Sequence, residues 1–228
     1  ALPISVTEDH TRVVHWAGKA VTDILKTLQN RFERLPDVVV YPADEQQVAA
    51  VTRLAVERDL VLIPFGGGTS ISRSLQPRPE ETRTVVSVDL GRMNKVLEID
   101  ETSCIARIQA GTLGPDMEDQ LNARGWTLGH FPDSFTHSTV GGWAATRSSG
   151  MQSDKYGDIA EIIRGMNVVR PGGTVKRRAS RTRHTTSWLA STSSGSSSGI
   201  GTLHRVATTA IRLARIRPLR WRSARRRI

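Results

Sequence analysis

Pro64-Phe65-Gly66-Gly67-Gly68-Thr69-Ser70 is the stretch of sequence that decides the fold. It follows the apolar run Leu60-Val61-Leu62-Ile63, which is short and branched enough to be a buried strand. Three glycines remove every Cβ from the turn, so its backbone can adopt positive φ and direct several N–H groups at one point. Such clusters of N–H groups bind anions, phosphate above all, and Thr69 and Ser70 add hydroxyl donors. The stretch therefore predicts a phosphate site, with a glycine turn that holds no ligand as the alternative.

The residues before this turn predict an α/β unit. Residues 38–41 form an apolar run typical of a strand, and Asp44 is a predicted helix N-cap, with Gln47 placed to complete a capping box. The helix that follows carries Val48 and Val51 on one face. A strand, a helix and a second strand thus lead into the glycine turn. Ligands of open α/β layers commonly bind at that end of a strand.

Periodic patterns elsewhere predict further elements. The apolar stripe Val21, Ile24, Leu25 and Leu28 predicts a helix within residues 1–35. Residues 84–90, 95–100 and 103–110 read as strands, and the last two make an antiparallel pair. A short helix is expected over 116–124, ended by Gly125, and a hairpin turn at 171–174.

A second loop rich in glycine and hydroxyl groups extends from His130 to Gly150. Ser138 or Thr139 can cap a helix that starts near Val140, and the unpaired N–H groups of a helix N-terminus are a second predicted anion seat. Two such loops suggest an extended ligand with several polar parts, such as a dinucleotide. The alternative is that both loops only turn corners. His130 and His137 make a weak metal pair, so we expect hydrogen-bonded loop histidines instead, and we expect Trp143 to be a packing residue.

Charge divides the 228-residue chain into two physically different parts. Residues 1–161 contain all 22 acidic residues and 16 of the 32 Lys and Arg, a net charge of −6, whereas residues 162–228 carry the other 16 basic residues and no acid. No apolar run approaches the ~20 residues of a membrane helix, and the N-terminus lacks the pattern of a secretion signal. The single cysteine, Cys104, excludes an internal disulfide and is expected to be a small packing residue.

The two loops together resemble the flavin-binding domain of the vanillyl-alcohol oxidase/p-cresol methylhydroxylase (PCMH) superfamily. Within it, residues 32–37 (Phe-Glu-Arg-Leu-Pro-Asp), 81–89 with Met93-Asn94, and 138–143 (Ser-Thr-Val-Gly-Gly-Trp) are similar to the alkyldihydroxyacetonephosphate synthases. The resemblance covers roughly residues 10–175. It implies an α+β fold: a PCMH-type FAD-binding domain of two α+β subdomains with FAD between them.

The resemblance also implies which residues contact FAD. By the family pattern the glycine stretch holds the pyrophosphate, and the second loop lines the rest of the cofactor. The residues so assigned are Pro64, Phe65, Gly66, Gly67, Gly68, Thr69, Ser70, Asp133, Ser134, Phe135, Thr136, His137, Ser138, Thr139, Gly141, Gly142, Thr146, Arg147, Ser148 and Ser149. Some relatives attach FAD through a histidine after the glycines, but Thr69 occupies that region here, so we expect non-covalent FAD. Arg73 follows where many relatives have small residues, and it either pairs with phosphate or is exposed.

The function implied by the resemblance is that of an alkylglycerone-phosphate synthase, which exchanges the acyl chain of acyl-dihydroxyacetone phosphate for a fatty alcohol in ether-lipid synthesis. An FAD-dependent oxidoreductase of 2-hydroxy acids or alcohols is the alternative within the superfamily. A lipid-type substrate is implied only for a full-length homologue, because the family's C-terminal substrate domain is missing from this sequence, and the catalytic residues stay unknown. We therefore expect this fragment to bind FAD weakly at best and to show little or no turnover. The resemblance also allows a homodimer, and a cytoplasmic location if the chain is bacterial or a peroxisomal one if it is eukaryotic.

We therefore divide the chain into an N-terminal helical segment (1–35), an incomplete FAD-binding domain (36–175) and a basic tail (176–228). The tail holds 14 basic residues and no acid, and residues 191–199 have a Ser/Gly linker composition. Three hypotheses fit it: an aberrant translation product, a disordered tail that binds nucleic acid or acidic membrane through phosphates, or a divergent but folded end of the FAD domain. We favour the first, and the second makes a basic nucleic-acid-binding module the alternative function.

Overall fold

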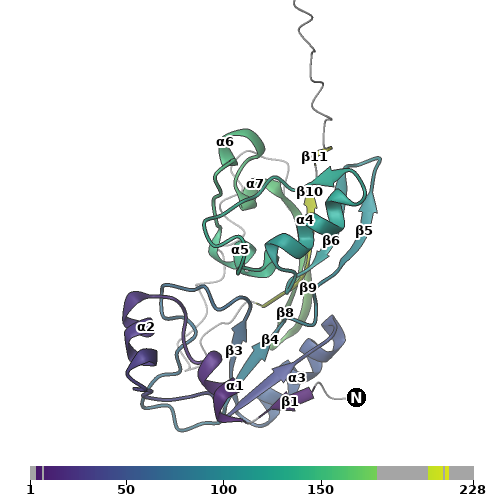
Figure 1. Ribbon diagram of the computed structural model, residues 1–228. Helices are drawn as coiled ribbons and strands as arrows, with labels where there is room; N and C mark the ends of the chain where they lie inside the picture. The colour runs from purple at the N-terminus through teal and green to yellow at the C-terminus, as the bar shows by residue number, and fades with distance from the viewer. Residues whose placement is uncertain (1–3, 7, 179–204, 213, 216–228) are drawn as a thin grey trace, which may run out of the picture.

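The structure is a computed structural model that describes residues 4–6, 8–178, 205–212 and 214–215. These residues form two lobes, each built from a sheet and its helices (Figure 1). The first lobe contains the glycine turn and the second contains the loop from His130 to Gly150. The expected α+β arrangement in two subdomains is confirmed.

The first lobe has a four-stranded sheet in the order β1-β2-β4-β3. Its strands are β1 (Ile4–Val6), β2 (Val38–Tyr41), β3 (Val61–Phe65) and β4 (Val85–Asp89). Strands β2, β4 and β3 are parallel and β1 is antiparallel to β2. Because β3 ends at Phe65, the glycine turn follows the carboxyl end of a parallel strand, as predicted.

Helix α3 (Glu45–Glu57) connects β2 to β3 and begins as its sequence predicts. The Asp44 side chain accepts a hydrogen bond from the Gln47 N–H at 2.8 Å. The Gln47 side chain reaches back one residue further than expected and accepts from the Ala43 N–H at 2.9 Å. The backbone N–H groups of Ala43 and Gln47 therefore each have an acceptor at the start of the helix.

The second lobe has a five-stranded antiparallel sheet in the order β5-β6-β10-β8-β9 and a two-stranded pair, β7 with β11. Its strands are β5 (Val96–Asp100), β6 (Ile105–Gln109), β7 (Trp126–Thr127), β8 (Ile163–Arg170), β9 (Gly173–Arg178), β10 (Arg205–Arg212) and β11 (Ala214–Arg215). Its helices are α4 (Gly114–Asn122), α5 (Val140–Thr146), α6 (Ser153–Tyr156) and α7 (Ile159–Ile162). The predicted β5–β6 pair and the hairpin turn between β8 and β9 are both present.

The structure places part of the basic tail inside the second sheet. Residues 176–178 complete β9, and β10 lies between β6 and β8 as the central strand, whereas we expected a disordered or aberrant segment from residue 176 onward. The sequence of β10, Arg-Val-Ala-Thr-Thr-Ala-Ile-Arg, is rich in β-branched residues, which suit a strand paired on both sides. Residues 179–204 and 216–228 lie outside the described residues, and there the tail hypotheses stay predictions.

One hydrophobic core joins the two lobes. It takes Val40 from β2, Val48 from α3, Ile108 from β6, Trp143 from α5 and Val168 from β8. Asn167 on β8 also donates a hydrogen bond to Glu45 on α3 at 2.9 Å. Apolar side chains from both lobes therefore hold the lobes together where they meet.

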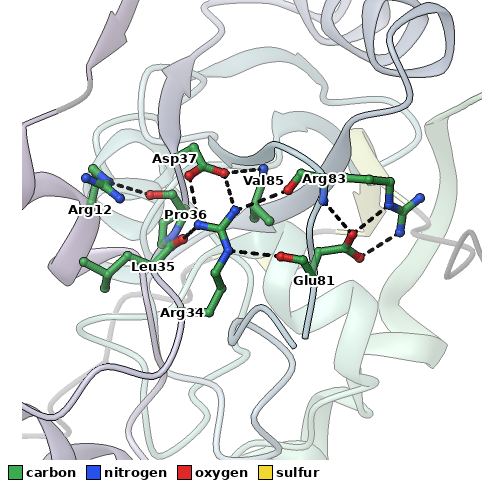
Figure 2. Close-up of polar contacts among 8 residues, drawn as sticks. All are labelled: Arg12, Arg34, Leu35, Pro36, Asp37, Glu81, Arg83 and Val85. Atoms are coloured by element: carbon green, nitrogen blue, oxygen red, sulfur yellow. Dashed lines mark hydrogen bonds and ion pairs between the residues drawn. The ribbon is translucent and has the colours of Figure 1, made fainter. Parts of the chain in front are cut away.

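The stretch Arg34–Asp37 holds the amino ends of β2 and β4 together (Figure 2). Arg34 forms a two-pronged ion pair with Asp37 and also donates to the carbonyl oxygens of Leu35, Glu81 and Arg83. Asp37 in turn accepts the N–H of Val85, the first residue of β4, at 2.8 Å. Hydrogen bonding to Arg34 lowers the pKa of Asp37, and the Arg83 guanidinium lowers that of Glu81 to about 2. This network lies at the amino ends of the strands, whereas the glycine turn follows the carboxyl end of β3. It therefore stabilises the fold without touching the site.

Two helices of the first lobe precede β2: α1 (Asp9–Val14) and α2 (Val21–Leu28). Strand β1 belongs to the first sheet, whereas within 1–35 we predicted a helix and no strand. The predicted helix α2 is present, but its apolar stripe faces outward, with Leu28 78% exposed. Its buried residue is Asp23, whose Oδ1 accepts a hydrogen bond from Gln76 at 2.6 Å.

Candidate functional site

The glycine turn and the second predicted loop pack directly against each other. A Cβ built on Gly66 would lie 2.5 Å from Thr139 Oγ1, and one on Gly67 would lie 1.5 Å from the carbonyl oxygen of His137. Only glycine fits at Gly67, because the obstacle is backbone that cannot rotate away. The structure thus brings together the two segments that the sequence singled out 70 residues apart, Gly67 and His137.

The turn presents a run of free backbone donors. Among the described residues, none provides an acceptor for the N–H groups of residues 66–70. Gly68 has φ +67°, in the left-handed region that bends successive N–H groups towards one side. The carbonyl oxygen of Phe65, by contrast, is bonded to Leu90 N–H at 3.1 Å, so the turn is anchored at its start. A fixed turn with unused N–H groups has the chemistry of an anion site.

The N-terminus of α5 is not the second anion seat that we predicted. Its N–H groups are already used: Val140 donates to the Thr112 carbonyl at 3.0 Å, Gly141 to the Ala110 carbonyl at 2.8 Å, and Gly142 to Thr139 Oγ1 at 3.3 Å. A Cβ on Gly141 would lie 2.7 Å from the Ala110 side chain. Gly141 therefore permits close packing of α5 on the end of β6, and this part of the prediction is wrong.

A buried tie fixes the loop that carries His137 to Thr139. Trp143 donates its indole N–H to Ser138 Oγ at 2.6 Å, and Ser138 Oγ donates to the Ser134 carbonyl at 2.8 Å. The Phe135 ring stacks on Trp143 with centroids 6.1 Å apart. Trp143 is buried, which confirms it as a packing residue and gives it a role in holding the loop against the glycine turn.

The predicted site residues differ in how much solvent they meet. Five are buried: Phe65, Gly68, Ser138, Thr139 and Gly141. Nine are partly buried: Pro64, Gly66, Gly67, Thr69, Ser70, Ser134, Phe135, Gly142 and Ser148. Six are exposed: Asp133, Thr136, His137, Thr146, Arg147 and Ser149. Among the residues of the second loop, His137 and Ser138 lie against Gly67, and Thr139 lies against Gly66.

Two further expectations are resolved at the surface of this region. Arg73 is exposed and donates to Thr22 Oγ1 on α2 at 3.2 Å. Cys104 is partly buried against the core, in the turn between β5 and β6 rather than in a strand.

Within the described ranges no three His, Cys, Asp or Glu side chains are grouped closely enough to hold a metal ion, and no helix there has the length and apolarity to cross a bilayer.

His130 determines whether the Ser148 hydroxyl donates or accepts the hydrogen bond between them. It is 1% exposed, its Nε2 lies 2.8 Å from Ser148 Oγ, and its Nδ1 has no partner among the described residues. A proton on Nε2 avoids an unpaired buried N–H, so Nε2 donates to Ser148. The Ser148 hydroxyl is then left free to donate to a ligand. Burial lowers the pKa of His130 to about 4, opposed by the charge of Asp158, so the ring is neutral at pH 7.

This buried histidine predicts a loss of stability in mild acid. Its folded pKa of about 4 lies below its ordinary value of 6.5, so the unfolded chain binds the proton first and the stabilisation is lost as the pH falls from 6.5 to 4. The difference in unfolding free energy between the wild type and His130→Gln should shrink by about 3 kcal/mol over that range. Urea denaturation at several pH values measures it. His137→Gln, at an exposed loop position, is the control, and a difference for His130→Gln that does not change with pH contradicts the prediction.

Comparison with known proteins assigns this arrangement to a family. The model of the family described as "FAD binding domain" matches residues 36–178, which include both loops and the strands between them. The chain belongs to this FAD-binding domain family. FAD is the cofactor of the domain. The match confirms the resemblance to FAD-binding proteins that the glycine and hydroxyl loops indicated.

Relatives of the FAD-binding domain include enzymes of two kinds. An alkyldihydroxyacetonephosphate synthase of Trypanosoma brucei brucei is 41% identical over 168 residues, covering 73% of this chain and 27% of the relative. A solved alkyldihydroxyacetonephosphate synthase structure superposes with a TM-score of 0.82 at 36% identity, covering 92% of this chain and 38% of that one. A mitochondrial D-lactate dehydrogenase [cytochrome] of Saccharomyces cerevisiae is 28% identical, covering 66% of this chain and 25% of the relative. The chain therefore spans about a quarter to two fifths of the length of these proteins.

Sequence reasoning missed the residues behind the turn. His15 and Gly18, from the segment that we set apart from the domain, pack against Phe65 and Ser70. No periodic pattern marks them. The only signal in the sequence was a glycine near aromatic residues, and that signal is weak without coordinates.

Proposed function

We propose that the turn at residues 66–70 binds the pyrophosphate of FAD, and that the protein is the FAD-binding part of a flavoenzyme of the alkyldihydroxyacetonephosphate synthase kind. The observation that carries the proposal is the set of N–H groups at the turn that have no acceptor among the described residues, next to a loop with exposed hydroxyls. The synthase kind is favoured over other flavoproteins because the synthase relatives have the higher identities.

The residues present fit such a cofactor. The backbone N–H groups of the turn suit phosphate oxygens, and the free Ser148 hydroxyl and the side chain of Thr136 suit the sugar-like part of the molecule. Thr69 offers no nucleophile of the histidine kind, so FAD is held without a covalent bond. When bound, the flavin ring supplies the electron-accepting or adduct-forming chemistry, and the protein supplies binding and orientation.

This chain's own contribution is to fix the two loops before the cofactor arrives. The Trp143–Ser138–Ser134 tie sets the second loop, and the His137 carbonyl and Thr139 hydroxyl meet the glycine turn face to face. His130 sets the direction of the Ser148 hydroxyl. A preorganised site of this kind loses less conformational entropy when the ligand binds.

An FAD-dependent 2-hydroxy-acid oxidoreductase is the second candidate function. The yeast D-lactate dehydrogenase relative favours it, although at lower identity than the synthases. Flavin reduction on addition of a 2-hydroxy acid would support this candidate, whereas the synthase kind leaves the flavin oxidised overall. Binding of a lipid-type substrate, formation of a homodimer and a peroxisomal location are proposed only for a full-length synthase of this kind.

Titration with FAD tests the proposed function. We expect flavin fluorescence to change saturably on addition of the protein, and riboflavin, which lacks the pyrophosphate and the adenosine, to bind at least about 30-fold more weakly. ADP, which carries the pyrophosphate without the flavin, should compete with FAD. If riboflavin binds as tightly as FAD, or ADP does not compete, the turn is not the pyrophosphate site. The basic tail is tested separately, because binding of nucleic acid through phosphates would weaken steeply with added salt.

A further inference from the structure

Residues 15–19 lie directly behind the glycine turn, although the family match begins at residue 36. Gly18 leaves no room for a side chain, because a Cβ there would lie 1.8 Å from the carbonyl oxygen of Ser70. The same oxygen accepts the N–H of Lys19 at 2.7 Å. The last residue of the turn is therefore held by a segment from outside the matched domain.

His15 is fixed at both ends of its ring. Its Nδ1 lies 2.7 Å from the carbonyl oxygen of Thr11, and its Nε2 lies 2.8 Å from Asp89 Oδ2. Both ring nitrogens therefore lie within hydrogen-bonding distance of an oxygen atom. The other oxygen of Asp89 accepts the Gly91 N–H at 2.7 Å. The buried imidazole is thus locked to α1 on one side and to the end of β4 on the other.

The fixed imidazole supports the turn through Phe65. The two rings are tilted against each other with centroids 4.3 Å apart. Phe65 is the last residue of β3, and its ring fills the space beside Gly68, where a Cβ would lie 2.8 Å from Phe65 Cζ. A continuous packed series therefore leads from His15 through Phe65 to Gly68, in the middle of the turn.

We propose that His15 is a positioning residue of the cofactor site, which acts through Phe65 to hold the N–H groups of residues 66–70 in their FAD-binding arrangement, and that residues 15–19 belong functionally to this site. The proposal rests on the proposed function, because it concerns the same turn. It adds to the site a residue that lies outside both the glycine turn and the second loop. It also places the functional boundary of the domain before residue 36.

The first experiment compares His15→Gln with His10→Gln, the same substitution at an exposed position of α1, the helix that ends just before His15. Affinity for FAD is measured by flavin fluorescence under conditions where circular dichroism shows each protein folded. We expect His15→Gln to bind FAD at least tenfold more weakly and His10→Gln to stay within twofold of the wild type. Equal affinities for all three proteins would overturn the proposal. Failure of the wild type to bind FAD would instead overturn the proposed function.

A double-mutant cycle with Phe65→Leu tests whether His15 acts through the Phe65 ring. If it does, the double variant should bind FAD no more weakly than the weaker of the two single variants, because one series of contacts is broken once. Independent losses that multiply in the double variant would show that His15 does not act through Phe65, which contradicts the proposal. A purely global loss of stability predicts no such non-additivity in the affinity of the folded protein.

If His15→Gln does not fold, Gly18→Ala decides the question. The added methyl group displaces the Ser70 carbonyl and leaves the His15 ring unaltered. Gly172→Ala is the matched control, because a Cβ there meets no atom within 4 Å. We expect an FAD affinity at least tenfold lower for Gly18→Ala and an unchanged affinity for Gly172→Ala. An unchanged affinity for Gly18→Ala would show that residues 15–19 do not position the turn.

Discussion

Replacing Gly67 by alanine is expected to weaken FAD binding by at least about 100-fold. The new methyl group would overlap the His137 carbonyl oxygen, since the two atoms would be 1.5 Å apart. Neither backbone can yield alone: the His137 loop is tied by Ser138 to Trp143, and β3 anchors the turn at Phe65. The turn and the loop must therefore separate, and the N–H groups of the turn lose the position that suits a pyrophosphate.

The measurement is FAD affinity by fluorescence titration, with folding checked by circular dichroism and urea denaturation. Gly172→Ala again serves as the control, because it adds the same methyl group in open space. Gly66→Ala is an informative intermediate. Its added Cβ meets the Thr139 side chain, which can rotate, so a smaller loss is expected. Binding by Gly67→Ala within threefold of the wild type would show that contact between the two loops is not required for FAD.

Replacing Arg34 by alanine is expected to lower the free energy of unfolding by about 3 kcal/mol. Arg34 makes five hydrogen bonds, two of them to the carboxylate of Asp37 and three to carbonyl oxygens. Without the guanidinium, Asp37 keeps only the Val85 N–H, and a partly buried carboxylate is left without its cation (Figure 2). The hydrogen bonds from Arg34 to the carbonyl oxygens of Glu81 and Arg83, in the segment that leads into β4, are lost as well.

Chemical denaturation at pH 7 measures this change. Arg53→Ala is the matched control, because Arg53 is exposed on α3 and we expect its removal to change stability by less than about 0.5 kcal/mol. Arg34→Lys keeps the charge but cannot form the fork with Asp37, so it should recover only part of the loss. FAD affinity of the folded Arg34 variants should stay near that of the wild type, since the network lies at the sheet edge opposite the turn. A loss as small as that of Arg53→Ala would contradict the role assigned to Arg34.

The local patterns of the sequence predicted most of the first lobe. Strand β2, the Asp44 cap, α3 and β3 follow from apolar runs and capping chemistry that act over a few residues. Three consecutive glycines directly after a buried strand predicted the turn, because residues without a Cβ suit a backbone that bends tightly. The family resemblance led us to expect that both loops contact one cofactor, and the direct packing of Gly67 on the His137 backbone is a contact that the coordinates add.

The errors arose where distant contacts override local pattern. The apolar stripe of α2 predicted its helix, but the stripe points outward and the opposite face buries Asp23, which is bonded to Gln76, a partner that no local pattern reveals. The N–H groups of α5 were expected to be free, yet Thr112 and Ala110 provide acceptors for them from a neighbouring segment. His15 and Asp89 are 74 residues apart, and neither is marked by its surroundings in the sequence.

The central position of β10 has a consequence for the order in which this chain folds. Ile105 of β6 and Arg212 of β10 are paired partners, although more than a hundred residues of synthesis separate them. Until the ribosome has released the latter, β6 and β8 each present an uncovered edge to other chains. Contacts of such long range slow folding and leave the nascent protein open to misassociation. The second lobe therefore stays open at its centre until a strand made more than a hundred residues after β6 has joined it.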